Sequence, residues 1–91
     1  MKHWHIWVKG TVQGVNFRNY TRKKALELGI NGRVMNHPDG TVHVLAEGSE
    51  EQLNQLVNYC RQGPPLSRVS AVNWEEAEVK GMSGFEIDYM R

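Results

Sequence analysis

The chain has 91 residues, of which 23% are charged, so we expect residues 1–91 to form a single globular domain. A net charge of +1 argues against a dedicated nucleic-acid-binding protein, because positive charge holds such proteins to their ligand. One cysteine excludes an internal disulfide, and neither a signal-peptide pattern nor a membrane span of ~20 apolar residues is found, so a cytoplasmic location is expected.

The first half of the chain alternates between strand and helix patterns. Apolar residues at every second position predict a strand at 4–9 with one buried face. Apolar residues at helical spacing then predict a helix over 17–28, which Gly29 can end. Two short strand patterns, at 30–36 and 41–47, flank the turn sequence HPDG and predict a hairpin.

The second half contains one more helix and two more strands. Ser49 and Gln52 have the spacing of a capping box at the start of an amphipathic helix, which Gly63 and the following prolines end. Alternation then predicts a strand at 68–77 and a last strand at 85–89. The order is β-α-β-β-α-β with an extra C-terminal strand. Two helices can cover only one face of the resulting mixed, mostly antiparallel sheet, so we predict an α+β, ferredoxin-like two-layer sandwich.

Three groups of reactive side chains have a simpler interpretation than a functional site. His3 and His5 could share a strand face and bind a metal ion, but no third ligand is recognisable, and we expect exposed or edge histidines. Cys60 lies on the apolar stripe of the second predicted helix and is expected in the core. The acidic residues of 75–78 are expected at the solvated end of a strand.

The segment GTVQGVNFR, residues 10–18, joins the first strand to the first helix. Its two glycines allow backbone conformations that bring N–H groups together at the helix N-terminus, where the helix dipole also favours an anion. Arg18 adds a permanent charge and a planar fork that matches phosphate oxygens. The basic run that it begins also contains Arg22, Lys23 and Lys24. Spacing alone leaves two interpretations open: an anion-binding loop, or a plain connection with a solvent-facing arginine.

A second segment, GRVMNHPDGTV at residues 32–42, places Asn36 at the end of a hairpin strand. In a split β-α-β arrangement that hairpin lies beside the first strand, so Asn36 is expected near the 10–18 loop. An uncharged amide both donates and accepts hydrogen bonds, and it can hold a water molecule and a substrate oxygen together. Alternatively, the Asn36 side chain starts the turn that follows.

Together, the two segments resemble the motifs of the acylphosphatase family. The first motif, G-x-V-Q-G-V-x-[aromatic]-R, is unbroken at residues 10–18. The second, G-x-V-x-N-x-x-D-G-x-V, is unbroken at residues 32–42. The similarity continues through Gly29 and the Gly63-Pro64 pair, and it therefore covers nearly the whole chain.

This resemblance implies an enzyme that hydrolyses the carboxyl–phosphate anhydride of small acyl phosphates without a metal or cofactor. The family's phosphate-binding arginine corresponds to Arg18, and its water-orienting asparagine corresponds to Asn36. Inorganic phosphate or sulfate is expected to compete with the substrate, and a monomer without nucleic-acid or membrane partners is expected. The family's sheet order is 4-1-3-2, with the fifth strand beside the second. The backbone donors to the phosphate are expected from Gln13, Gly14, Val15, Asn16 and Phe17.

Two other classes of protein share the predicted fold: a binding module, such as an RNA-recognition or metabolite-sensing domain, and an inactive relative of the enzyme. An RNA-recognition domain would carry exposed aromatic residues in its third strand, and residues 40–47 contain none. Trp4, Trp7 and Trp74 could form a stacking platform for bases, although tryptophans on a small sheet are typically packing residues. An inactive relative would keep the fold without the site. The presence of both the motif arginine and the motif asparagine argues against it.

Overall fold

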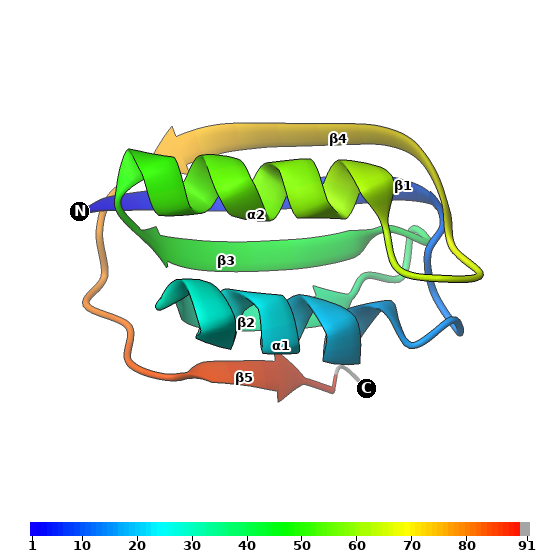
Figure 1. Ribbon diagram of the computed structural model, residues 1–91, viewed down its shortest axis with the longest axis horizontal. Coiled ribbons are helices and arrows are strands. Elements are labelled where there is room, and N and C mark those ends of the chain that lie inside the picture. The colour runs from blue at the N-terminus through cyan, green and yellow to red at the C-terminus, as the bar shows by residue number, and fades with distance from the viewer. Residues whose placement is uncertain (90–91) are drawn as a thin grey trace.

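The strands and helices follow the predicted order in the computed structural model, which describes residues 1–89 (Figure 1). Their bounds are β1 (Lys2–Thr11), α1 (Phe17–Leu28), β2 (Asn31–Asn36), β3 (Val42–Gly48), α2 (Glu50–Gln62), β4 (Arg68–Ala77) and β5 (Phe85–Asp88). Most bounds agree with the sequence prediction to within a residue. β1 is longer than predicted, because it pairs with β3 along one edge and with β4 along the other.

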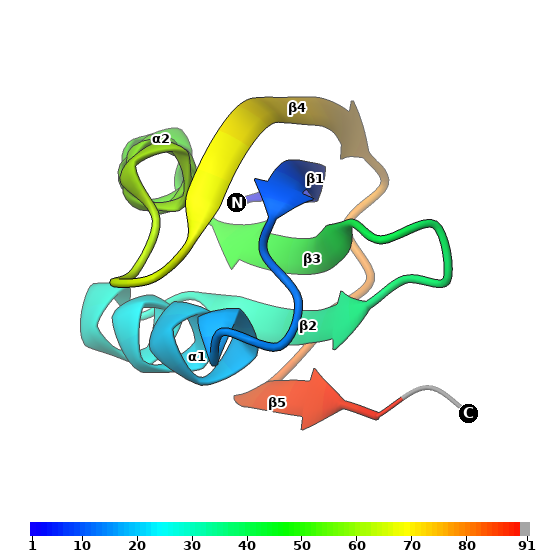
Figure 2. The same cartoon turned by 90° about the vertical axis from the view of Figure 1, so that its right-hand side faces the viewer.

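The sheet has the order β4-β1-β3-β2-β5, in which β5 runs parallel to β2 and the other neighbours are antiparallel. Both helices cover the same face, and no helix of residues 1–89 covers the other (Figure 1, Figure 2). The predicted ferredoxin-like α+β sandwich is therefore confirmed. The sheet order that the family resemblance implies is confirmed with it.

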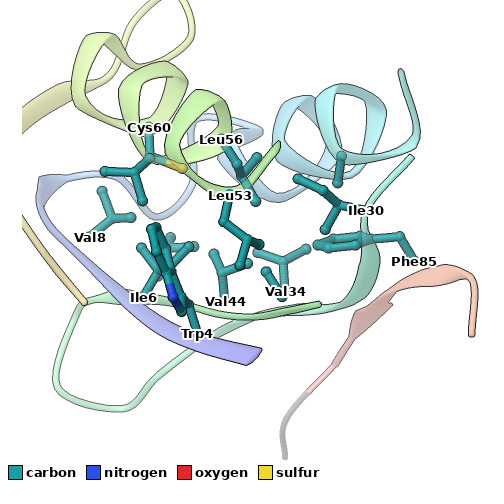
Figure 3. Packing of buried hydrophobic residues seen from close by; sticks show 14 of the residues in the cluster. Trp4, Ile6, Val8, Ile30, Val34, Val44, Leu53, Leu56, Cys60 and Phe85 are labelled. Atoms are coloured by element: carbon teal, nitrogen blue, oxygen red, sulfur yellow. The ribbon is translucent and has the colours of Figure 1, made fainter. Parts of the chain in front are cut away.

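The core lies between the sheet and the two helices (Figure 3). Trp4, Ile6 and Val8 alternate along β1 and belong to the same buried cluster as Leu53 of α2. Complete burial of an aliphatic side chain such as that of Leu53 contributes about 1.5–3 kcal/mol. Cys60 also lies in this cluster, and burial raises the pKa of its thiol to about 12. The prediction of a core cysteine is confirmed.

The tryptophans pack on both sides of the sheet rather than forming one platform. The rings of Trp4 and Trp74 stack with their centroids 3.7 Å apart, on the helix side of the paired strands β1 and β4. Trp7 points to the opposite face, because side chains alternate along a strand, and it stacks on His43 at 5.0 Å. This division agrees with the predicted packing role.

The ends of the helices follow the local sequence signals. The Gln52 N–H donates to Ser49 Oγ at 3.1 Å, and the Ser49 N–H donates to Gln52 Oε1 at 2.7 Å, so the capping box of α2 is confirmed. α1 ends at Gly29, whose φ of 76° lies in the left-handed region that glycine readily adopts. Within residues 1–89, neither helix is long and apolar enough to cross a membrane.

The expectation of an exposed or edge position is wrong for His3, which is fully buried. β1 and β3 pair so that His3 lies opposite Glu47, with His3 Nδ1 2.8 Å from Glu47 Oε2. The Glu47 carboxylate also accepts hydrogen bonds from the N–H groups of Lys80 and Met82, which lie in the β4–β5 connection. Burial acts to raise the pKa of Glu47, but the hydrogen bonds from Lys80, His3 and Met82 hold it below its ordinary value.

Protonation of His43, on the helix-free face of the sheet, should weaken the fold. Burial lowers the pKa of His43, and repulsion from His5 and His37 lowers it further, against the opposing effect of Asp39. The unfolded chain then binds the proton more strongly, so the free energy of unfolding should fall as the pH drops below about 6.5. Urea unfolding between about pH 7.5 and 5.5 should show a weaker pH dependence for His43→Gln than for the wild-type chain. An equal pH dependence of the free energy of unfolding in the two proteins would contradict the role of His43.

Candidate active site

Three strand ends meet at one edge of the sheet. β1 and β2 are both antiparallel to β3 and so run in the same direction, and β5 runs parallel to β2. The carboxyl ends of these strands therefore lie at the same edge, where residues 12–16 lead from β1 into α1 (Figure 2). This topology brings the two sequence motifs together and adds the end of β5, which neither motif contains.

A cavity of about 310 Å³ lies at this edge. Its volume is at the lower end of the range for small-molecule sites, which is roughly 300–1,000 Å³. The loop after β1 and the first turn of α1 contribute most of its lining, and the other strand ends contribute Asn36, Ile87 and Tyr89. No group of three or more His, Cys, Asp or Glu side chains in the described part of the chain could hold a metal ion.

Two residues of the loop adopt left-handed backbone conformations. Gly14 has a φ of 76°, and a Cβ there would meet nothing within 4 Å, so the backbone angle rather than space explains the glycine. Asn16 has a φ of 65°, which asparagine tolerates better than most residues, and the Asn19 side chain donates a hydrogen bond to its Oδ1. Turns that contain such residues aim successive N–H groups at one concave side, where an anion can bind.

The Gln13 side chain ties this loop to the turn between β2 and β3. Its Nε2 donates to the carbonyl oxygen of His37 at 2.8 Å and to that of Thr41 at 2.9 Å. Asn36 immediately precedes this turn, so the two hydrogen bonds fix the position of the loop relative to the end of β2. A glutamine is suited to this place, because one amide group donates two hydrogen bonds without adding charge beside an anion site.

The N-terminus of α1 differs from that of α2 in the donors that it leaves available. No side chain of residues 1–89 caps α1, and its first turn contains no acidic residue. α2 has both features, with Ser49 as its cap and Glu50 and Glu51 in its first turn. The first N–H groups of a helix lack intrahelical partners and carry the positive end of its dipole. The start of α1 therefore offers donors to an anion in the cavity.

Arg18 brings positive charge to the same place. It is half-buried in the first turn of α1 and lines the cavity, with its guanidinium carbon 5.0 Å from the centre of the Tyr89 ring. Two other members of the basic run have different contacts. Arg22 donates to the Phe85 carbonyl oxygen at 2.9 Å, and the Lys24 ammonium lies over an aromatic ring of α2. These contacts hold α1 against its neighbours and leave the cavity to Arg18.

Asn36 does not form the following turn through its side chain. A backbone hydrogen bond from His37 to Thr41 closes that turn, and the Asp39 carboxylate accepts from both the N–H and the hydroxyl of Thr41. Asn36 Oδ1 is instead buried without a hydrogen-bond partner among residues 1–89, and the residue lines the cavity. An unsatisfied buried acceptor costs about 1–3 kcal/mol.

A family model described as Acylphosphatase matches residues 4–87. The chain belongs to the acylphosphatase family. Both sequence motifs lie within the matched range, and they include the loop, the arginine and the asparagine that meet at the cavity.

Individual acylphosphatases agree with this assignment. The sequence is 49% identical over 80 residues to an acylphosphatase of Thermus thermophilus, which covers 88% of this chain and 91% of that protein. The fold matches the acylphosphatase of Bacillus subtilis with a TM-score of 0.95 at 37% identity, over 98% of this chain and 100% of the other. It matches an acylphosphatase of Coxiella burnetii with a TM-score of 0.92 at 41% identity, over 96% and 92% of the two chains. The predicted family membership is confirmed.

Two site residues predicted from the acylphosphatase motifs do not line the cavity. The Gln13 side chain is used in the contacts with the β2–β3 turn, and Val15 packs against the core. The predicted residues that the structure places at the cavity are Gly14, Asn16, Phe17, Arg18 and Asn36.

The cavity also contains residues that sequence reasoning missed, namely Val12, Asn19, Ile87 and Tyr89. Val12 and Asn19 directly flank the predicted residues 13–18 in the sequence. Ile87 and Tyr89 come from the last strand pattern, more than forty positions from either motif. The acylphosphatase sheet order could have indicated them, because it places the end of the fifth strand beside that of the second.

Proposed function

We propose that the cavity binds the phosphoryl group of a small acyl phosphate and that Asn36 directs a water molecule to its phosphorus atom. The strongest support is that Asn36, whose buried Oδ1 has no hydrogen-bond partner among residues 1–89, lines the same cavity as Arg18 and the uncapped start of α1. As a member of the acylphosphatase family, the chain is an enzyme that hydrolyses acyl phosphates to a carboxylate and inorganic phosphate.

Three sources of positive potential hold the phosphoryl oxygens in this proposal. The Arg18 guanidinium supplies a full charge and parallel N–H donors, and the loop N–H groups from Gly14 to Phe17 supply neutral donors. The dipole of α1 adds to both. In phosphoryl transfer the transition-state charge is spread over the equatorial oxygens, so donors aimed at these oxygens lower the barrier.

Asn36 is suited to the water because its amide is uncharged. The amide can form a hydrogen bond with the water without repelling the phosphoryl group, whereas a carboxylate at this position would repel it. The water oxygen bonds to phosphorus while the bond from phosphorus to the acyl oxygen breaks, and the electron pair leaves with the carboxylate. This leaving group needs no proton. The proton of the water passes to a phosphoryl oxygen, since no Asp, Glu or His among residues 1–89 lines the cavity.

Hydrolysis of benzoyl phosphate by the purified protein tests this proposal. Inorganic phosphate should raise the apparent KM without lowering kcat, because it occupies the site of the phosphoryl group, and sulfate should act in the same way. Phosphate should also raise the melting temperature by mass action. Dialysis against EDTA should leave the rate unchanged. Inhibition that excess substrate does not relieve, or a loss of activity on chelation that one divalent ion restores, would overturn the proposal.

The proposal includes a monomeric cytoplasmic enzyme that binds neither nucleic acid nor a membrane. The net charge of +1 supports the absence of nucleic-acid binding, since such a chain has little overall attraction to a phosphate backbone. The buried free thiol of Cys60 is compatible with a reducing compartment. Titration with single-stranded RNA should show no binding under conditions in which phosphate competes with the substrate.

A further inference from the structure

Tyr89 lies where the ends of β2 and β5 meet the first turn of α1. The parallel pairing of these strands ends with Met35 opposite Asp88, and Asn36 and Tyr89 are the residues that directly follow this pair. Tyr89 lines the cavity, and the centre of its ring is 5.0 Å from the guanidinium carbon of Arg18. Tyr89 is therefore adjacent to both residues of the proposed chemistry, although neither motif contains it.

Contact with Arg18, rather than packing in the core, explains the position of the Tyr89 ring. The residue is 67% exposed, so burial of apolar surface does not account for its position. Arg18 forms no ion pair with a carboxylate among residues 1–89, and the ring of Tyr89 is the partner of its guanidinium there. A guanidinium within about 6 Å of an aromatic ring is attracted to its face.

An aromatic partner has an advantage over a carboxylate at this place. A carboxylate would neutralise Arg18 and compete with the phosphate for its N–H donors. The ring face restricts the planar guanidinium to fewer orientations and leaves its edge, which carries the N–H donors, free to bind oxygens. Ordering a long side chain before the ligand arrives reduces the entropy lost on binding.

We propose that Tyr89 is a positioning residue that orients the Arg18 guanidinium toward the bound phosphoryl group without neutralising it. This role rests on the proposed function of the cavity. It predicts that loss of the ring weakens phosphate binding by about two- to fivefold, which is the most that a cation–π contact at an exposed site can contribute. Both KM and the inhibition constant of phosphate should rise, and kcat/KM should fall.

Calorimetric titration with inorganic phosphate, together with benzoyl phosphate kinetics, tests this role in a set of variants. Tyr89→Leu keeps an apolar side chain but removes the ring, and it should bind phosphate more weakly at an almost unchanged melting temperature. Tyr89→Phe keeps the ring and should restore most of the affinity. Tyr59→Leu is the matched control, because it removes the ring of the other cation–π pair. In that pair the Lys24 nitrogen lies 5.8 Å from the centre of the Tyr59 ring, and neither residue lines the cavity.

A double variant separates an effect through Arg18 from a direct one. In an Arg18→Ala background, Tyr89→Leu should cause no further loss in the residual kcat/KM, because the group that it orients is absent. An equal loss with and without Arg18, or a Tyr89→Phe variant as weak as Tyr89→Leu, would overturn the proposed role. Wild-type binding of phosphate with unaltered binding by Tyr89→Leu would overturn this role alone. Absence of phosphate binding in the wild-type protein would overturn the phosphate site as well.

Discussion

Replacing Arg18 with alanine should remove nearly all acyl-phosphate hydrolysis while the fold remains intact. The side chain lines the cavity beside the uncapped N-terminus of α1, where its charge is the strongest attraction for the phosphoryl oxygens. An arginine that stabilises phosphoryl transfer contributes about 10³–10⁵ in rate, so we expect kcat/KM to fall by at least about 10³. Stability should change by no more than about 1 kcal/mol, because Arg18 is not a core residue.

Two further variants make this result specific. Arg18→Lys keeps the charge but replaces the planar fork by a single ammonium group, so it should recover only a small part of the activity. Lys24→Ala removes a cation of the same helix that lies over the Tyr59 ring and does not line the cavity, and it should retain wild-type kinetics. The assignment of Arg18 fails if correctly folded Arg18→Ala protein turns over at a rate close to that of the wild type.

Replacing Asn36 with alanine should lower kcat far more than it weakens phosphate binding. If the Asn36 amide orients the water, its removal costs an interaction that is formed with the nucleophile and not with the phosphate. Loss of one such oriented polar group costs about 10²–10³ in rate, or roughly 3–4 kcal/mol. Stability should not suffer from a lost hydrogen bond, because this oxygen has no partner within residues 1–89.

Two comparisons separate this role from that of a turn residue. Asn36→Asp keeps the shape but places a carboxylate beside the phosphate, so phosphate inhibition should weaken as the pH rises through the pKa of the new group. Asp39→Ala removes the acceptor of the Thr41 N–H and hydroxyl in the same turn, and it should lower the unfolding midpoint without changing kcat per folded molecule. If Asn36→Ala behaves like Asp39→Ala, the water-orienting role is wrong.

The sequence by itself determined the elements of this fold, their order and the two central site candidates. The capping box of Ser49 and Gln52 and the helix end at Gly29 depend on residues within a few positions of one another. The alternation along β1 reflects which of its faces is buried. Such patterns can be recognised in the sequence because they do not depend on residues elsewhere in the chain. The uninterrupted motifs also predict Arg18 and Asn36 as site residues.

The tertiary structure decided several contacts between distant residues that the sequence analysis did not predict. His3 is buried because strand pairing places Glu47, 44 positions away, opposite it. Gln13 reaches across 24 positions to the carbonyl oxygen of His37, and Tyr89 reaches Arg18 because β5 pairs in parallel with β2. The register of each pairing is set by the fit of all buried faces at once, since a shift by one residue would turn every side chain of a strand to the other face. The register is therefore a property of the whole sheet and cannot be predicted from a short segment of sequence.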